Sequence, residues 1–80
     1  MIHKYIVTAE GESRLDIVSR ISMLFMRRHI DVESLTYLPM AGCTSCYRVC
    51  ALAREETIRQ VICQMEHIEG LATVRYEESY

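Results

Sequence analysis

Apolar residues recur at helical spacing in the first third of the chain, after a stretch rich in β-branched and aromatic residues. The stretch HKYIVTA at 3–9 predicts a strand, and the EGE sequence at 10–12 predicts a turn. Ser13 is the expected N-cap of the following helix, with Asp16 three residues later as in a capping box. We expect this helix to end near His29, with an apolar face made of Ile17, Val18, Ile21, Leu24 and Phe25.

The remainder of the chain predicts two strands, a second helix and a last strand. Residues 31–38 are strand-like and are ended by Pro39, residues 40–45 form a turn, and residues 46–53 form the third strand. The second helix is expected from Arg54 to His67, with Gly70 as its left-handed cap. Its apolar face consists of Ile58, Val61, Ile62, Met65 and Ile68. Residues 71–77 form the last strand.

The order β-α-β-β-α-β is typical of the α+β, ferredoxin-like sandwich, in which a four-stranded antiparallel sheet carries two helices on one face. The 80 residues predict a single domain, 1–80. The other sheet face and the edge of the second strand then lack cover. A chain this short buries only about 60% of its unfolded surface, so we expect an oligomer.

Composition excludes several classes of function. Net charge is −2 and the longest basic run is Arg27–Arg28, which argues against nucleic-acid binding. No apolar run approaches the roughly 20 residues needed to span a membrane. The first residues, MIHKY, do not resemble a signal peptide. We therefore expect a cytoplasmic protein with reduced thiols.

Four cysteines raise the question of a metal or redox site. Alternation along the third strand places Cys46, Arg48 and Cys50 on the open face, because Arg48 resists burial. Cys46 and Cys50 are then roughly 13 Å apart along the strand, too far to share a metal. Cys63 is expected in solvent on the polar side of the second helix. Only Cys43 and Cys46 could share a metal or a disulfide, and we favour a hairpin with reduced thiols.

The run SRISMLFMRRHIDVESLTYLP, residues 19–39, resembles the first helix and second strand of the small, regulatory subunit of acetohydroxyacid (acetolactate) synthase. In that family the N-terminal part is an ACT domain, which is βαββαβ. The likeness is clear over residues 14–39 and stays in register to about residue 74. It is carried by Ser19-Arg20-Ile21, Leu24-Phe25, Arg28, the segment 32–36 and Pro39. Each part of this run also has an ordinary structural explanation. Leu24-Phe25 can simply belong to the core, the arginines to a solvent-exposed face, and the segment 32–36 to a strand edge.

The resemblance implies an effector site at the first strand-to-helix turn, formed by Glu12, Ser13, Leu15 and Asp16. Family members that sense branched-chain amino acids carry Asn-x-x-Gly there, whereas this chain has SRLD at 13–16. Ser13 keeps a hydrogen-bonding oxygen, but Asp16 brings a negative charge to the place of the effector carboxylate. We therefore expect insensitivity to valine, as in short single-ACT subunits. Alternatively, Asp16 pairs with Arg14 or Arg20 and leaves the site clear.

A second departure from the family lies at the end of the first helix. His29 stands where the family often has Gly. We expect it to cost a few tenths to about one kcal/mol of capping.

The function implied by the resemblance is regulatory. The chain would bind and activate the catalytic large subunit in branched-chain amino acid biosynthesis, and that partner carries the thiamine diphosphate, magnesium and FAD. This chain itself has no Gly-x-Ser-x-Gly motif and no Gly-rich phosphate loop, so we expect no enzyme activity and no cofactor. The family also pairs side by side, which implies a homodimer whose interface includes Arg20, Glu33, Leu35 and Tyr37. Two alternatives remain: a free-standing ACT-type amino-acid sensor, and a thiol or metal protein built on Cys43 and Cys46.

Overall fold

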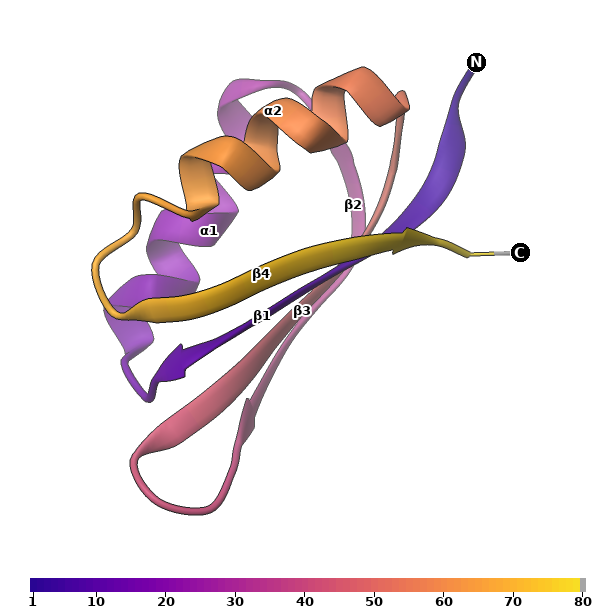
Figure 1. Ribbon diagram of the computed structural model, residues 1–80. Helices are drawn as coiled ribbons and strands as arrows, with labels where there is room; N and C mark the ends of the chain where they lie inside the picture. Colours follow the sequence, from indigo (N-terminus) through magenta and orange to yellow (C-terminus); the bar gives the residue numbers. More distant parts are fainter. Residues whose placement is uncertain (80) are drawn as a thin grey trace.

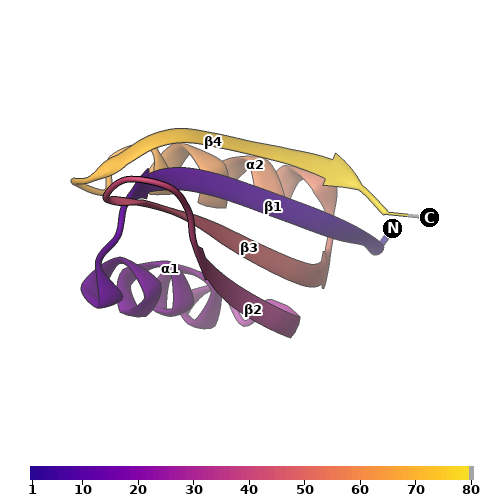
Figure 2. The same ribbon diagram turned by 90° about the horizontal axis from the view of Figure 1, so that it is seen from below.

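The computed structural model describes residues 1–79 and contains six elements in the predicted order. The strands are β1 (His3–Glu12), β2 (Asp31–Pro39), β3 (Thr44–Ala53) and β4 (Leu71–Glu78), and the helices are α1 (Leu15–Arg27) and α2 (Glu55–Met65). The strands form one antiparallel sheet in the order β2-β3-β1-β4, so β2 and β4 are the edges. Both helices cover the same face (Figure 1), with α1 behind β2 and α2 behind β4 (Figure 2). The ferredoxin-like α+β prediction is confirmed.

The core lies between the two helices and the covered face of the sheet, as the helical and strand spacings of the apolar residues predict. Each helix contributes its predicted apolar stripe, and each central strand contributes alternate residues. The fully buried or nearly buried members include Tyr5, Val7, Ala9, Ile17, Ile21, Phe25, Tyr47, Val49, Ala51, Ile58, Val61, Ile62 and Met65. The chain ends meet beside this layer, where the Ser79 N–H donates to the Lys4 carbonyl at 2.8 Å.

The alternation predicted for β3 is confirmed, but the open face is less exposed than expected. Tyr47 points into the core, and Arg48 is exposed on the opposite face. Cys46 shares that open face, yet only 7% of it is accessible. Because β3 is a central strand, Cys46 is flanked by Leu38 of β2 on one side and Glu10 of β1 on the other.

The prediction of a turn at 10–12 is wrong, because β1 continues to Glu12. Gly11 allows this, since a Cβ there would lie 2.2 Å from the carbonyl oxygen of Gly70. The same carbonyl accepts the Glu12 N–H at 2.8 Å and joins the end of β1 to the start of β4. Gly70 has the expected left-handed backbone, with φ 102°, but it precedes β4 and does not cap α2, whose C-cap is Glu66.

The connection after α1 also uses a left-handed residue. α1 ends at Arg27 with Arg28 as its C-cap, and His29 follows with φ 55°. The His29 N–H donates to the Met26 carbonyl at 3.0 Å, which satisfies one of the last helix carbonyls. The chain therefore adopts a glycine-type conformation at His29, the position where the family that it resembles often has Gly.

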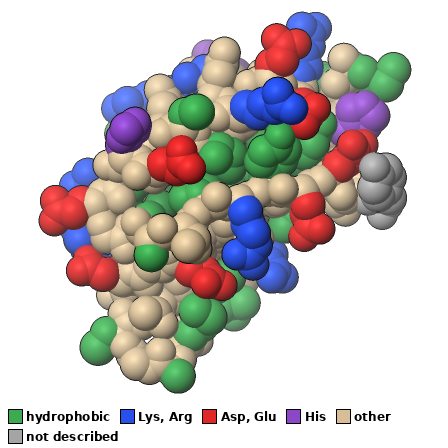
Figure 3. Space-filling model, viewed as in Figure 1, with side chains coloured by type: hydrophobic (Ala, Val, Ile, Leu, Met, Phe, Trp, Pro, Cys, Tyr) green, Lys and Arg blue, Asp and Glu red, His purple; other side chains and the backbone are tan. Residues whose placement is uncertain are grey.

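The surface mixes charges and leaves some apolar side chains uncovered. On the face shown in Figure 3, Lys and Arg are interspersed with Asp and Glu, and hydrophobic side chains lie between α2 and β4 and at the tip of the β2–β3 hairpin. Within residues 1–79, neither α1 with 13 residues nor α2 with 11 is long and apolar enough to cross a bilayer.

Candidate functional site

The β1–α1 turn, residues 12–16, joins the end of a central strand to the start of α1. Arg14 is the N-cap, in extended backbone conformation, and no side chain caps the helix. The prediction that Ser13 caps α1 in a capping box with Asp16 is therefore wrong. The Ser13 N–H donates to the Cys43 carbonyl at 2.9 Å, which ties the turn to the β2–β3 hairpin.

The Ser13 side chain instead takes part in a row of hydrogen-bonded hydroxyls that connects the turn to β3 and β2. Ser45 on β3, which is fully buried, donates to the Ser13 hydroxyl at 2.8 Å. The Ser13 hydroxyl in turn shares a hydrogen bond of 2.6 Å with the phenol of Tyr37 on β2. Hydrogen bonds from Ser13 and then Ser45 lower the pKa of Tyr37 from its usual value. The turn thus presents a linked row of hydroxyls that can donate or accept.

Tyr47 fixes the backbone of the turn from below. Its buried hydroxyl donates to the Glu12 carbonyl at 2.5 Å and lies 3.2 Å from the Arg14 carbonyl. The same oxygen accepts the Arg14 N–H at 3.1 Å. Its ring also lies 5.3 Å from that of Tyr37, centroid to centroid. Because a buried phenol needs a partner, Tyr47 holds the turn in one position.

Charged side chains cover the outer side of the turn. Arg14 makes two hydrogen bonds to the Asp16 carboxylate, at 3.0 and 2.7 Å, and a longer one to Glu12 at 3.3 Å. These contacts, Asp16 first, raise the pKa of Arg14 further, and the Arg14 guanidinium lowers the pKa of Asp16 from its usual value. Arg20 approaches Asp16 at 3.5 Å. The Asp16 carboxylate therefore pairs with Arg14 and, at a longer distance, with Arg20.

The turn and the side chains that contact it bring charged and hydroxyl groups together. They include two guanidinium groups, two carboxylates and four hydroxyls, with Leu15 73% exposed beside them. These groups could hold a small zwitterion, with guanidinium for its carboxylate and carboxylate for its ammonium. The four predicted effector-site residues, Glu12, Ser13, Leu15 and Asp16, all lie in this turn.

The four predicted interface residues do not share one surface. Leu35 and Tyr37 lie half-buried on the helix side of edge strand β2. Glu33 lies at a register shift in β2 and pairs with Lys4 of β1 at 3.0 Å, across the intervening β3. Arg20 lies on α1 next to the groove between the two helices. The structure brings Leu35 and Tyr37 together and leaves Glu33 and Arg20 apart from them.

An apolar cleft opens between α1 and β2. Its volume is about 160 Å³, and its lining includes Phe25, Met26, Val32 and Leu35. Met26 is 67% exposed and Val32 38% exposed. The free edge of the sheet therefore adjoins a hydrophobic surface.

The thiols do not come together. All four are free: Cys43 and Cys63 are exposed, Cys46 is buried and Cys50 is intermediate. Among residues 1–79, no three His, Cys, Asp or Glu side chains are grouped so that they could hold a metal ion.

The sequence interpretation missed Tyr47 and Ser45 as parts of this site. A signal was present, because both belong to the core-facing alternation of β3 and carry hydroxyls that need partners once buried. What could not be read from the sequence was the identity of those partners. They lie 32 to 35 residues away in the turn.

Comparison with known proteins supports the fold. No family model matches the chain, and no curated protein matches it. The C-terminal domain of the MgtC protein from Mycobacterium tuberculosis superposes with TM-score 0.83 at 10% identity, covering 98% of this chain and 88% of that one. The ACT domain from GTP pyrophosphokinase of Chlorobium tepidum gives 0.76 at 10% identity, covering 96% and 100%.

The acetolactate synthase small subunit from Thermotoga maritima superposes with TM-score 0.76 at 18% identity. The match covers 91% of this chain and 46% of that one, so this chain spans about half the length of that subunit. At these identities the likeness is one of fold. The chain has the fold of an ACT domain.

Proposed function

We propose that this chain is a non-catalytic small subunit of acetohydroxyacid synthase that binds and activates the catalytic large subunit without responding to valine. The observation that carries the proposal is the signature run at 19–39, which occupies α1 from Ser19 and all of β2. In an ACT fold α1 and β2 lie next to each other at one edge of the sheet, so the residues of this run form one continuous surface. The fold shared with the acetolactate synthase small subunit of Thermotoga maritima supports the same proposal.

Homodimerisation through β2 is part of this proposal. β2 is an edge strand whose outer N–H and C=O groups face away from the sheet, and such edges pair readily with another strand. The apolar α1–β2 cleft beside it would be covered by the same contact. Two copies would then form one continuous eight-stranded sheet, with their first helices meeting near residues 13–20. Regulation would act through this paired surface, while the thiamine diphosphate, magnesium and FAD remain on the large subunit.

The test is reconstitution with the catalytic large subunit of the same organism. We expect the two chains to co-elute in size-exclusion chromatography and the synthase rate to rise severalfold on addition of this chain. Glu33→Lys on β2 should weaken activation, whereas Glu66→Lys, which changes another exposed carboxylate, after α2, should not. A large subunit that neither co-elutes with this chain nor gains activity would refute the proposal.

The β1–α1 turn favours a second candidate, a free-standing ACT-type amino-acid sensor. Paired guanidinium and carboxylate groups next to exposed Leu15 suit an amino acid with an aliphatic side chain. Isothermal titration with branched-chain and sulfur amino acids separates the two candidates. Micromolar affinity in the absence of any large subunit would favour the sensor.

A further inference from the structure

A groove runs between α1 and α2 on the outer side of the helical layer. Its volume is about 520 Å³, within the range of small-molecule sites. It lies on the flank of α1 opposite to the α1–β2 cleft, because α1 contributes Arg20, Leu24 and Arg27 to the groove but Phe25 and Met26 to the cleft.

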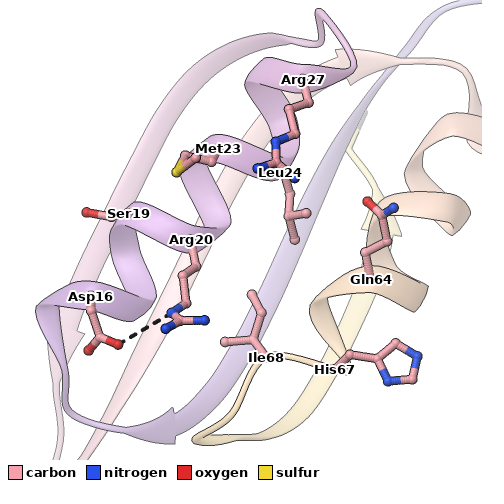
Figure 4. A pocket seen from close by; sticks show the side chains of 9 residues that line it. All are labelled: Asp16, Ser19, Arg20, Met23, Leu24, Arg27, Gln64, His67 and Ile68. Atoms are coloured by element: carbon pink, nitrogen blue, oxygen red, sulfur yellow. Dashed lines mark ion pairs between the residues drawn. The ribbon is translucent and has the colours of Figure 1, made fainter.

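The floor of the groove is aliphatic. Leu24 of α1 and Ile68, in the segment after α2, point toward each other between the helices (Figure 4). Leu24 is half-buried and Ile68 is only 9% exposed, so both are held by the core beneath them. The aliphatic part of a ligand can therefore pack on these two side chains without moving them.

The rim is cationic. Arg20 and Arg27 are two helical turns apart on one flank of α1. Both residues line the groove, and Figure 4 shows the Arg27 side chain extending toward Leu24 and the Arg20 side chain turned toward Asp16. The Arg27 side chain makes no hydrogen bond or ion pair with any other residue in 1–79. Arg20 has only the 3.5 Å contact with Asp16, whose carboxylate is bound more closely by Arg14. Both guanidinium groups therefore keep donors for another acceptor, and Gln64 offers an amide from the opposite wall.

We propose that the α1–α2 groove binds a small organic anion with an aliphatic body, whose charged group is held by Arg20 and Arg27 and whose body lies on Leu24 and Ile68. Guanidinium groups bind carboxylate and phosphate oxygens alike, so the charged group belongs to either class. The groove lining holds these two cations and one carboxylate, that of Asp16, which Arg14 binds more closely than Arg20 does. The local charge of the groove is therefore positive, although the net charge of the chain is −2. The inference does not depend on the proposed synthase partner.

The experiment uses the full chain with methyl-labelled Leu and Ile and records chemical shifts during titration with four probes: hexanoate, acetate, inorganic phosphate and the uncharged hexanamide. Hexanoate should move the Leu24 and Ile68 methyl resonances with millimolar affinity and should bind more tightly than acetate, because only hexanoate has a body for the floor. The Arg20→Gln and Arg27→Gln double variant should lose about tenfold in affinity for hexanoate. Arg75→Gln, on exposed β4 outside the groove, is the matched control and should bind as the unaltered chain does.

Each other outcome contradicts the proposal in a defined way. Equal binding of hexanoate and hexanamide would show an apolar site without charge recognition. Binding of phosphate and acetate as tightly as hexanoate would show a bare anion site. No shift at Leu24 and Ile68 with any probe, or an unchanged affinity in the double variant, would show that the groove binds neither class.

Discussion

The molecule consists of two βαβ halves, β1-α1-β2 and β3-α2-β4. They have the same order of elements, but they differ in the turn between strand and helix and in the strand at the edge of the sheet. In the first half, the β1–α1 turn is fixed by Tyr47 and covered by the Arg14–Asp16 pair. In the second half, the β3–α2 turn has only Arg54 as N-cap, exposed and without a side-chain cap. Both helices thus begin without a side-chain cap, and the first turn carries in addition the contacts with Tyr47 and the Arg14–Asp16 pair.

The two edge strands, β2 and β4, also differ in how each is connected to the helix of its half. On β4, the Tyr76 hydroxyl donates to Glu55 at 2.9 Å and accepts from Arg59 at 3.0 Å, which ties this edge to α2. Among residues 1–79, no side-chain hydrogen bond joins β2 to α1 in this way, and the apolar α1–β2 cleft lies between them. The second half therefore has a side-chain connection between its helix and its edge strand, where the first half has an apolar cleft.

The largest expected effect tests whether the two halves still share one core. Phe25, 1% exposed on α1, should cost about 3–5 kcal/mol when changed to Ala, and Ile58→Ala on α2 should cost about 2–5 kcal/mol. These losses approach the whole stability of a small domain. Urea unfolding measures both, with Met26→Ala, a neighbour that is 67% exposed, as the control. If Phe25→Ala melts within a few degrees of the unaltered chain, α1 does not pack as the structure has it.

The shared core is also the part of the molecule that the sequence predicts well. The apolar stripes of α1 and α2 and the alternation of β3 are local patterns, and Ile17, Phe25, Tyr47 and Ile58 are all buried as expected. Local periodicity is sufficient there, because each residue needs only to face the layer beneath it. The fold class follows from the order of those elements.

The first turn is where sequence reasoning failed, and the cause is tertiary. Ser13 has the composition of an N-cap, but its hydroxyl bonds Tyr37 and Ser45, which are 24 and 32 residues away. Asp16 has the position of a capping-box residue, but Arg14 takes its carboxylate. In both cases a long-range or competing partner replaced the local one.

The second prediction concerns the ligand side of the first turn. We expect no heat with millimolar valine for the unaltered chain, because Asp16 already occupies Arg14 and adds a like charge near any effector carboxylate. The double change Ser13→Asn with Asp16→Gly releases Arg14 from Asp16, leaving only its longer contact with Glu12, and should raise affinity for valine by roughly tenfold or more. Isothermal titration measures both, and Asp31→Asn, at the exposed start of β2, is the control. Binding of valine to the unaltered chain at or below millimolar concentration would contradict this account.

The third prediction separates the two edges. Analytical ultracentrifugation at micromolar concentration should give about twice the chain mass of 9.3 kDa. Thr36→Lys, in the middle of β2, brings like charges together in a paired sheet and should weaken the dimer about tenfold. Thr73→Lys, equally exposed on β4, should leave the dimer unchanged. A monomeric unaltered chain would exclude the β2 dimer, and equal weakening by both variants would show that β2 is not the edge that pairs.

The smallest expected effect lies at His29, where the first half ends its helix in a glycine-type conformation without glycine. At φ 55° the Cβ of His29 crowds its own backbone, a strain that Gly does not have. His29→Gly also loosens the unfolded chain, which offsets part of the gain. The net change should be a stabilisation of about 0.5–1 kcal/mol, seen as a small rise in melting temperature. His67→Gly, exposed beyond α2, is the matched control and should not stabilise, since no left-handed strain is relieved there. Equal melting temperatures for the His29→Gly variant and the unaltered chain would mean that the Met26 contact already compensates the strain.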